Sequence, residues 1–269
     1  MEVKFLLGIA VAIAVIFFAA AFAQSLQKSA MAKEDHETLY QVSTIDALMQ
    51  GVYDGVQPFG ELKKHGDFGI GTFDALDGEM VAVDTRYYQV RSDGIAYPVG
   101  DAMTTPFATV TYFEPDIQFS VDRQMNYSLL STYLSGRLPS KNLIYAIRAD
   151  GTFPAMKVRS VPRQSPPYLP LTAAVANQSV FEYTNVTGTV VGFYMPEFTK
   201  GINVPFYHLH FISADKKTGG HILDFTIAAN TTITLDITPE FEMSLPTKGA
   251  FASTDLSKDT SADLAKVER

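Results

Sequence analysis

The 269-residue sequence contains no cysteine and no tryptophan. Without cysteine the chain can form no disulfide, thiolate nucleophile, iron–sulfur cluster or cysteine zinc site, so any metal ion must be held by His, Asp or Glu. Nucleic acid is excluded as a partner by charge, because 21 Lys and Arg stand against 29 Asp and Glu and the net charge is −8. With 46% hydrophobic and 12% aromatic residues, the sequence is typical of a globular protein with a large core.

The N-terminus has the pattern of a targeting segment. Residues 5–23 are all apolar or small and carry no charge, and they end in the small-x-small sequence Ala21-Phe22-Ala23. We expect a secretory signal peptide that is cleaved after Ala23, and an uncleaved membrane anchor is the alternative, since the run is long enough to cross a bilayer. Either interpretation predicts that the remaining chain is exported. Residues 24–38 are polar and are expected to be a linker.

Strand patterns dominate the rest of the chain. From residue 68 onward, short runs rich in β-branched and aromatic residues are separated by glycine turns, of which Asp77-Gly78 and Asp93-Gly94 are typical of hairpins. A few helices are expected, one of them over residues 44–51, where Thr44 or Ser43 can cap the first turn. The predicted class is therefore α+β, rich in β-structure.

A proline-rich stretch at residues 162–170 predicts a domain boundary. We expect an N-terminal β-rich domain at residues 39–165. The C-terminal β-rich domain, at residues 166–269, would carry the metal site described next and end in a tail.

Three of the five histidines fall within 14 positions of one another, as His208-Leu209-His210 and then His221. Alternate residues of a strand face the same side, so His208 and His210 project together, and the intervening turn can bring His221 beside them. Three converging imidazoles suit Zn²⁺, and also Fe, Ni or Cu. Packing or surface histidines are the ordinary alternative, and that interpretation is kept for His36 and His65.

Three other residues could complete such a site. Glu79 begins a strand after a turn, although a solvated turn acid has the same pattern. Arg159 lies in an apolar run and needs an anionic partner, which could be a carboxylate substrate or an acid of the chain. Arg148 and Arg163 compete with it for that role, and Thr72 could offer a hydroxyl group to a substrate.

With these residues the chain resembles the alpha-acetolactate decarboxylase family. The similarity runs in order over residues 40–269. The matching stretches are HGDFGIGTFDALDGEMVAVD (65–84), YAIRADGTF (145–153), KVRSVPRQ (157–164), GTVVGFYMPEF (188–198), INVPFYHLHFISADKKTGGHILDF (202–225) and the C-terminal KVER.

The resemblance implies an activity, the conversion of 2-acetolactate to acetoin and CO₂. It also implies two β-sheet or barrel-like domains with the metal between them, and a homodimer. The roles it implies are zinc binding by His208, His210 and His221, substrate binding by Thr72 and Arg159, and catalysis by Glu79, Arg159 and Glu268. One departure is Phe206, which stands where the resemblance predicts a glycine.

Two other functions remain open at this point. A cupin-type metal dioxygenase or isomerase is suggested by Gly201 before a His-x-His strand. Against it, no Glu follows His210 at the usual ligand spacing, and no Pro-x-Gly precedes His221. The other alternative is a non-catalytic exported β-protein that binds a metal or a sugar.

Overall fold

The structure is a computed structural model, and it describes residues 37–268. The predicted signal peptide or anchor at 1–23 and the linker to residue 36 lie outside the described residues. The chain divides into two units, 1–35 and 36–269, and the fold below is that of the second unit. Within residues 37–268, no helix has both the length and the apolar character needed to cross a membrane.

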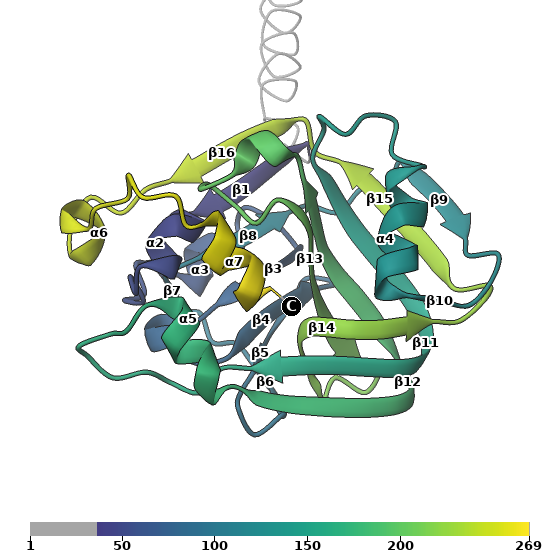
Figure 1. The fold of residues 1–269 in the computed structure, drawn as a ribbon, viewed down its shortest axis with the longest axis horizontal. Coiled ribbons are helices and arrows are strands. Elements are labelled where there is room, and N and C mark those ends of the chain that lie inside the picture. The colour runs from purple at the N-terminus through teal and green to yellow at the C-terminus, as the bar shows by residue number, and fades with distance from the viewer. Residues whose placement is uncertain (1–36, 269) are drawn as a thin grey trace, which may run out of the picture. The chain divides into compact units, whose positions relative to one another are not determined.

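The first sheet has seven strands (Figure 1). All neighbouring strands in this sheet are antiparallel except β16 (Glu240–Ser244) and β1 (Thr38–Val42), which are parallel. The order is β16 (Glu240–Ser244), β1 (Thr38–Val42), β8 (Ala108–Thr111), β3 (Phe68–Thr72), β4 (Glu79–Val83), β5 (Arg86–Val90) and β6 (Ala96–Pro98).

The second sheet also has seven strands, and four of them form a closed ring. Their order is β10 (Met125–Asn126), β14 (Gly219–Ile227), β13 (Phe206–Ser213), β12 (Ser179–Met195), β11 (Tyr145–Ser160), β15 (Thr232–Ile237) and β9 (Ile117–Ser120). Because β14 pairs with both β13 and β11, the ring β11–β12–β13–β14 closes on itself like a small barrel. A third, two-stranded sheet joins β2 (Gln57–Pro58) and β7 (Thr104–Thr105).

The helices are short and few, which confirms the predicted β-rich class. The predicted helix at 44–51 is α2, and Thr44 caps it by accepting a hydrogen bond from the Ala47 amide. The helical elements are α2 (Ile45–Met49), α3 (Phe59–Leu62), η1 (Asp74–Leu76), α4 (Tyr127–Ser135), α5 (Leu171–Ala174), η2 (Val175–Asn177), η3 (Glu197–Thr199), α6 (Ala250–Ser253) and α7 (Ser261–Val267).

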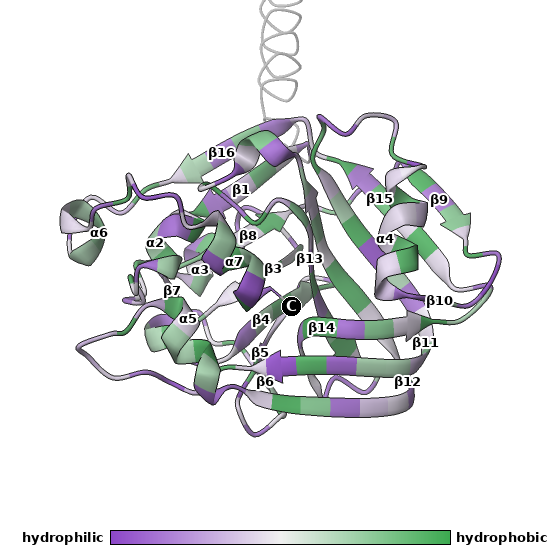
Figure 2. Ribbon diagram, viewed as in Figure 1, coloured by the Kyte–Doolittle hydropathy of each residue, from purple (hydrophilic) through white to green (hydrophobic). Residues whose placement is uncertain are grey.

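β4 is buried at every position, and its successive side chains pack on opposite faces of the first sheet. Along β4, Val81 packs in a hydrophobic cluster with Val191 and Ile212 of the second sheet, while its neighbours Met80 and Ala82 pack on the other face of the first sheet. The first cluster therefore joins the two sheets. At the start of β12, Phe181, Tyr183 and Val186 are partly buried against the core of the second sheet, and Figure 2 shows hydrophobic and hydrophilic residues mixed along this part of the strand.

The predicted division at residue 165 stays a prediction. The strands are shared between the two sides of that position, because β9 to β11 precede it and lie in the same sheet as β12 to β15, which follow it. In addition, the late strand β16 returns to the first sheet and lies beside β1. The two sheets are thus tied together by the chain path as well as by their shared core.

Phe206, the departure from the expected glycine, has left-handed backbone geometry. Its φ is +68° and its side chain is half exposed, with the ring against Tyr194. This region of φ disfavours every side chain that has a Cβ. We expect Phe206→Gly to be more stable than Phe206→Ala by about 1 kcal/mol, the reverse of the usual order of Ala and Gly in a strand. Urea unfolding of both variants measures the difference, and an alanine variant of equal or greater stability would contradict it.

Asp236 on β15 is an acid buried outside the cavity described below. It is 2% exposed, and its Oδ2 atom accepts a hydrogen bond of 3.3 Å from the Glu114 amide. Burial raises the pKa of Asp236 to about 7, and the negative charges of Asp116 and Glu37 add to that increase. Because the folded-state pKa lies above the unfolded value, ionisation costs stability, and this cost grows as the pH rises towards 7.

We therefore expect Asp236→Asn to raise the free energy of unfolding by roughly 2–4 kcal/mol at pH 8 and to change it little at pH 4. Asp224→Asn is the matched control, since Asp224 is an exposed acid in the same sheet. Denaturant unfolding at both pH values measures the effect. A gain of equal size at pH 4 and pH 8 would show that ionisation of Asp236 is not its cause.

Candidate metal centre and active site

The β13–β14 hairpin brings the three predicted histidines together. His208 and His210 face one side of β13, and His210 pairs directly with His221 across the hairpin. All three are buried, and one ring nitrogen of each lies within 4.8 Å of the others. The convergence expected from the His-x-His spacing and the glycine turn is therefore confirmed.

Gly220 allows β14 to approach the neighbouring strand. Its φ is +139°, and a Cβ at this position would lie 2.5 Å from the carbonyl oxygen of Arg159 on β11. Only glycine fits both constraints. As a result, the next residue, His221, lies opposite Arg159 in the β11–β14 pairing, and the guanidinium belongs to the same site as the imidazoles.

The hydrogen bonds leave ring nitrogens available as ligands. The Nδ1 atom of His210 lies 2.8 Å from the carbonyl oxygen of Met80, and since a carbonyl only accepts, Nδ1 carries the proton. The Nε2 atoms of His210 and His221 are buried without a hydrogen-bond partner. Burial lowers the pKa of His208 to about 3 and lowers the pKa of His210 and of His221, and Arg159 adds to this, so the imidazoles are neutral.

Two carboxylates lie beside the imidazoles, one from Glu79, which is 7% exposed, and one from Glu268, whose side chain is 14% exposed. Glu79 Oε2 is 3.8 Å from the Nε2 atom of His210, while Glu268 Oε2 is 3.7 Å from that of His208 and 3.8 Å from that of His221. Burial raises the pKa of each carboxyl group to about 7, and the positive charge of Arg159 opposes this in both cases. Both acids thus titrate near neutrality in this protein environment.

Of the three arginines considered for substrate binding, Arg148, Arg159 and Arg163, only Arg159 forms no ion pair with a carboxylate of residues 37–268. It is 4% exposed, its Nη1 donates a hydrogen bond of 3.2 Å to the Gln178 side chain, and its Nε has no partner. Arg148 instead binds Asp84 and Asp150, and Arg163 binds Asp74 and approaches Asp77. A buried guanidinium without an acid can therefore accept an anionic ligand.

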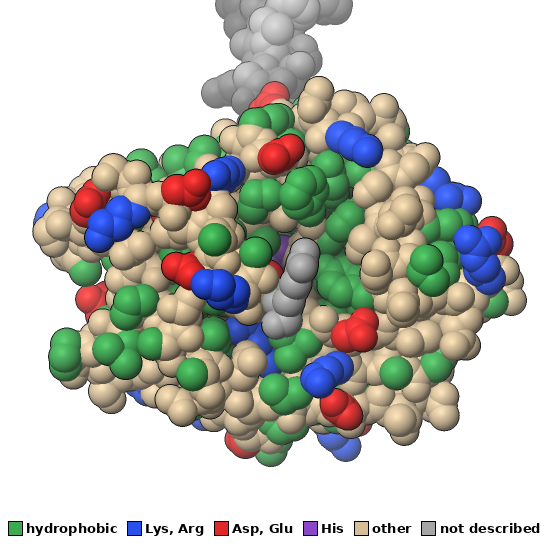
Figure 3. Space-filling model, in the orientation of Figure 1, with side chains coloured by type: hydrophobic (Ala, Val, Ile, Leu, Met, Phe, Trp, Pro, Cys, Tyr) green, Lys and Arg blue, Asp and Glu red, His purple; other side chains and the backbone are tan. Residues whose placement is uncertain are grey.

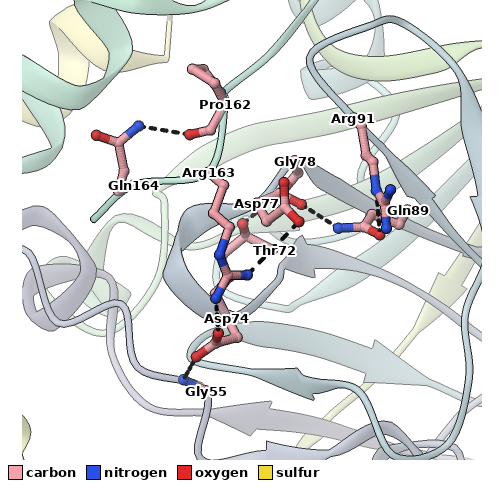
Figure 4. A network of polar contacts seen from close by, with 10 residues as sticks. All are labelled: Gly55, Thr72, Asp74, Asp77, Gly78, Gln89, Arg91, Pro162, Arg163 and Gln164. Atoms are coloured by element: carbon pink, nitrogen blue, oxygen red, sulfur yellow. Dashed lines mark hydrogen bonds and ion pairs between the residues drawn. The ribbon is translucent and has the colours of Figure 1, made fainter. Parts of the chain in front are cut away.

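Thr72 and the turn that follows it are held by a polar network (Figure 4). The Thr72 hydroxyl donates a hydrogen bond of 2.7 Å to the carbonyl oxygen of Gly78. Between them, Ala75 and Leu76 both have left-handed φ values, a conformation that costs energy and is retained where neighbouring contacts enforce it. Arg163 supplies such a contact, with a 2.7 Å ion pair to Asp74. The network fixes the turn immediately before Glu79.

These polar groups line one cavity, which is partly open to solvent. In the space-filling view a histidine is visible only over a small area, in a hollow at the centre of the face (Figure 3). The apolar wall of this cavity was not foreseen, because in a sequence such residues look like any other core residue. It is formed by Ile45, Leu48, Leu76, Phe107, Val161 and Leu171.

The residues present fit a divalent metal ion. Three buried, neutral imidazoles that lie close together, two of them with an Nε2 atom that has no hydrogen-bond partner, are the kind of donor set that binds Zn²⁺ and other late transition metals. The Met80 carbonyl fixes the ring of His210, a contact typical of metal-binding histidines. A buried donor set of this kind, with two titratable acids and a guanidinium in one cavity, is typical of the active site of an enzyme.

Comparison with known proteins gives the family. The family model of alpha-acetolactate decarboxylases matches residues 39–258. An alpha-acetolactate decarboxylase of Methanosarcina mazei is 56% identical over 233 residues, which cover 87% of this chain and 81% of the relative. An alpha-acetolactate decarboxylase of Methylococcus capsulatus is 46% identical over 235 residues, which cover 87% of this chain and 90% of the relative.

A solved structure agrees with this assignment. The crystal structure of alpha-acetolactate decarboxylase from Bacillus subtilis strain 168 superposes with a TM-score of 0.83 at 40% identity, covering 86% of this chain and 98% of that one. The chain therefore belongs to the alpha-acetolactate decarboxylase family, and it is a decarboxylase.

Proposed function

We propose that the chain is a metal-dependent enzyme that converts 2-acetolactate to acetoin and CO₂, with zinc as its metal. The observation that carries the proposal is one cavity that holds three imidazoles, two carboxyl groups and a guanidinium without an acidic partner. Each feature matches one need of the substrate, which bears a carboxylate, a ketone and a neighbouring hydroxyl group.

His208, His210 and His221 would hold the metal. The chemistry that a bound divalent ion supplies here is Lewis-acid polarisation of the ketone, which then accepts the electron pair left by departing CO₂. The protein groups around the site keep the imidazoles neutral and exclude bulk water, since all three side chains are buried.

Arg159 would bind the substrate carboxylate through its guanidinium. The N–H donors of this group lie in one plane, and two parallel N–H bonds match the two oxygens of a carboxylate. Its hydrogen bond to Gln178 fixes one side of the group and leaves Nε without a protein partner. Thr72, which lines the same cavity and already donates its hydroxyl hydrogen to Gly78, can still accept a hydrogen bond from the substrate hydroxyl.

Glu79 would supply the proton that replaces CO₂ on the reacting carbon. A carboxyl group with its pKa raised to about 7 by burial holds a proton near neutral pH and can release it without a large cost. Glu268, on the side of His208 and His221, would act on the opposite side of the centre. The reacting carbon is planar after CO₂ has left. With one acid on each side of the centre, a proton could reach either face of this carbon.

Export and dimerisation are further parts of the proposal. The apolar run at residues 5–23 supports export to the periplasm or the medium, either after cleavage or with the enzyme anchored outside the cytoplasm. Family resemblance supports a homodimer. Fractionation and N-terminal sequencing of the exported protein test export, and light scattering tests the dimer.

The decisive experiment is an acetoin assay under anaerobic conditions, with the full chain and with a chain that lacks residues 1–23. We expect both to form acetoin from racemic 2-acetolactate, to lose activity with a chelator and to regain it with zinc. Metal-loaded protein that forms no acetoin would overturn the proposal. Oxygen consumption by an iron-loaded sample would then favour a dioxygenase.

A further inference from the structure

The acid Glu268 reaches the histidines from the last helix of the chain. We call residues 254–268 the C-terminal strap. It ends in α7, whose Leu264 and Val267 are buried in a hydrophobic cluster with Ile45 of α2 and Leu171 of α5. Figure 1 shows α7 beside these two helices, next to the strands that carry the site. The seven residues of α7 are too few to form a stable helix alone, so its structure depends on this docking.

One shielded polar contact joins the start of α7 to the rest of the fold. The Thr260 hydroxyl, in a residue only 8% exposed, donates a hydrogen bond to the Asp46 carboxylate of α2. A second link, the ion pair of Lys200 with Asp259 at 3.0 Å, joins side chains that are each more than half exposed. Exposed ion pairs contribute little to stability, so the Thr260 bond is the stronger of these two polar links at the start of α7.

We infer that Thr260 and Asp46 form a latch that positions Glu268 at the histidine centre. The latch lies one helix length from Glu268, and α7 connects the two rigidly. It is also attached to α2, which carries Ile45 and Leu48 of the cavity wall, so docking of the strap places Glu268 and completes the wall together. Thr260 and Asp46 are thus positioning residues for the proposed reaction, and this inference rests on the proposed function for the role of Glu268.

Three substitutions test the latch in the full-length, metal-loaded protein. Thr260→Val keeps the shape of the side chain and removes the hydroxyl, while Thr260→Ser restores it. Thr254→Val is the matched control on the same strap, because the Thr254 hydroxyl bonds only to Ala250, within its own turn. The first readout is the rate of trypsin cleavage after Lys266, a residue of α7 that becomes a substrate when the helix undocks.

We expect trypsin to cleave Thr260→Val about 5- to 10-fold faster than wild type, because loss of one hydrogen bond raises the undocked fraction of α7 by about that factor. Thr260→Ser and Thr254→Val should keep the wild-type rate. The second readout is zinc affinity in competition with a chelator. We expect Thr260→Val to weaken it, and to cause no further weakening when Glu268→Gln is already present, because the latch acts through Glu268.

Two results would overturn the inference. One is wild-type cleavage of Thr260→Val, and the other is an equal loss of zinc affinity with and without Glu268→Gln, which would mean a general loss of stability. Neither readout requires turnover. A protein that forms no acetoin would therefore reject the proposed function, while the cleavage rates and zinc affinities still decide the latch.

Discussion

His210→Ala should release the metal and abolish acetoin formation. His210 is the most buried of the three histidines at 1% exposed, and it pairs with His221 on the neighbouring strand. Its Nδ1–H bond to the Met80 carbonyl aims Nε2 into the site, and alanine supplies no donor atom in its place. We expect metal affinity to fall at least ~100-fold, more than is usual for loss of a residue that only supports a ligand. Elemental analysis and the acetoin assay measure both effects.

The matched control is His65→Ala. His65 stacks on Tyr40 at 3.7 Å and does not line the cavity, so this variant should keep its metal and its turnover. Added zinc should not rescue His210→Ala at concentrations that restore the chelated wild type. Full metal content in His210→Ala would mean that the three imidazoles do not form the metal site.

Glu79→Gln should keep the metal and lose turnover. Glutamine has nearly the same shape as glutamate and leaves the three histidines unchanged, but it cannot deliver a proton to carbon. Loss of a general acid of this kind costs about 10²- to 10⁴-fold in turnover. Single-turnover measurements of CO₂ and acetoin release separate loss of carbon–carbon cleavage from loss of protonation.

Glu182→Gln is the control for the Glu79 substitution. Glu182 is an exposed acid of β12 that pairs with Lys157 and does not line the cavity, so its removal should leave turnover unchanged. Normal turnover by Glu79→Gln would show that the proton comes from elsewhere, with Glu268 as the next acid to test. Loss of metal in Glu79→Gln would instead assign Glu79 a role in holding the ion.

The histidine hairpin shows how far local sequence can predict a site. Strand periodicity fixes that His208 and His210 face the same side, and the glycine turn before His221 allows only a tight return of the chain. Both rules act over a few residues, so they do not depend on the rest of the fold. The same holds for the helix at 44–51, where the Thr44 cap and Gly51, with φ of +85°, mark both ends.

The family resemblance predicted site residues that strand periodicity could not, because they lie far from the histidines in sequence. Nothing local links Glu79, Arg159 and Glu268, which lie on β4, on β11 and beyond α7. Their common location in one cavity was expected only from the family pattern. Local patterns also left Arg148, Arg159 and Arg163 as equal candidates, and only the resemblance favoured Arg159, because the partners of Arg148 and Arg163 lie up to 89 positions away in the sequence.

The sequence by itself determined the β-rich class, the facing histidines and the family, because these depend on short periodic patterns and on matching motifs. Only the tertiary structure decided that Arg159 forms no ion pair with an acid of the described residues, that apolar side chains line one wall of the cavity, and that Thr260 bonds to Asp46 of α2. These features arise from contacts between segments far apart in sequence. Such contacts are selected by the packing of the whole domain, and no local propensity encodes them.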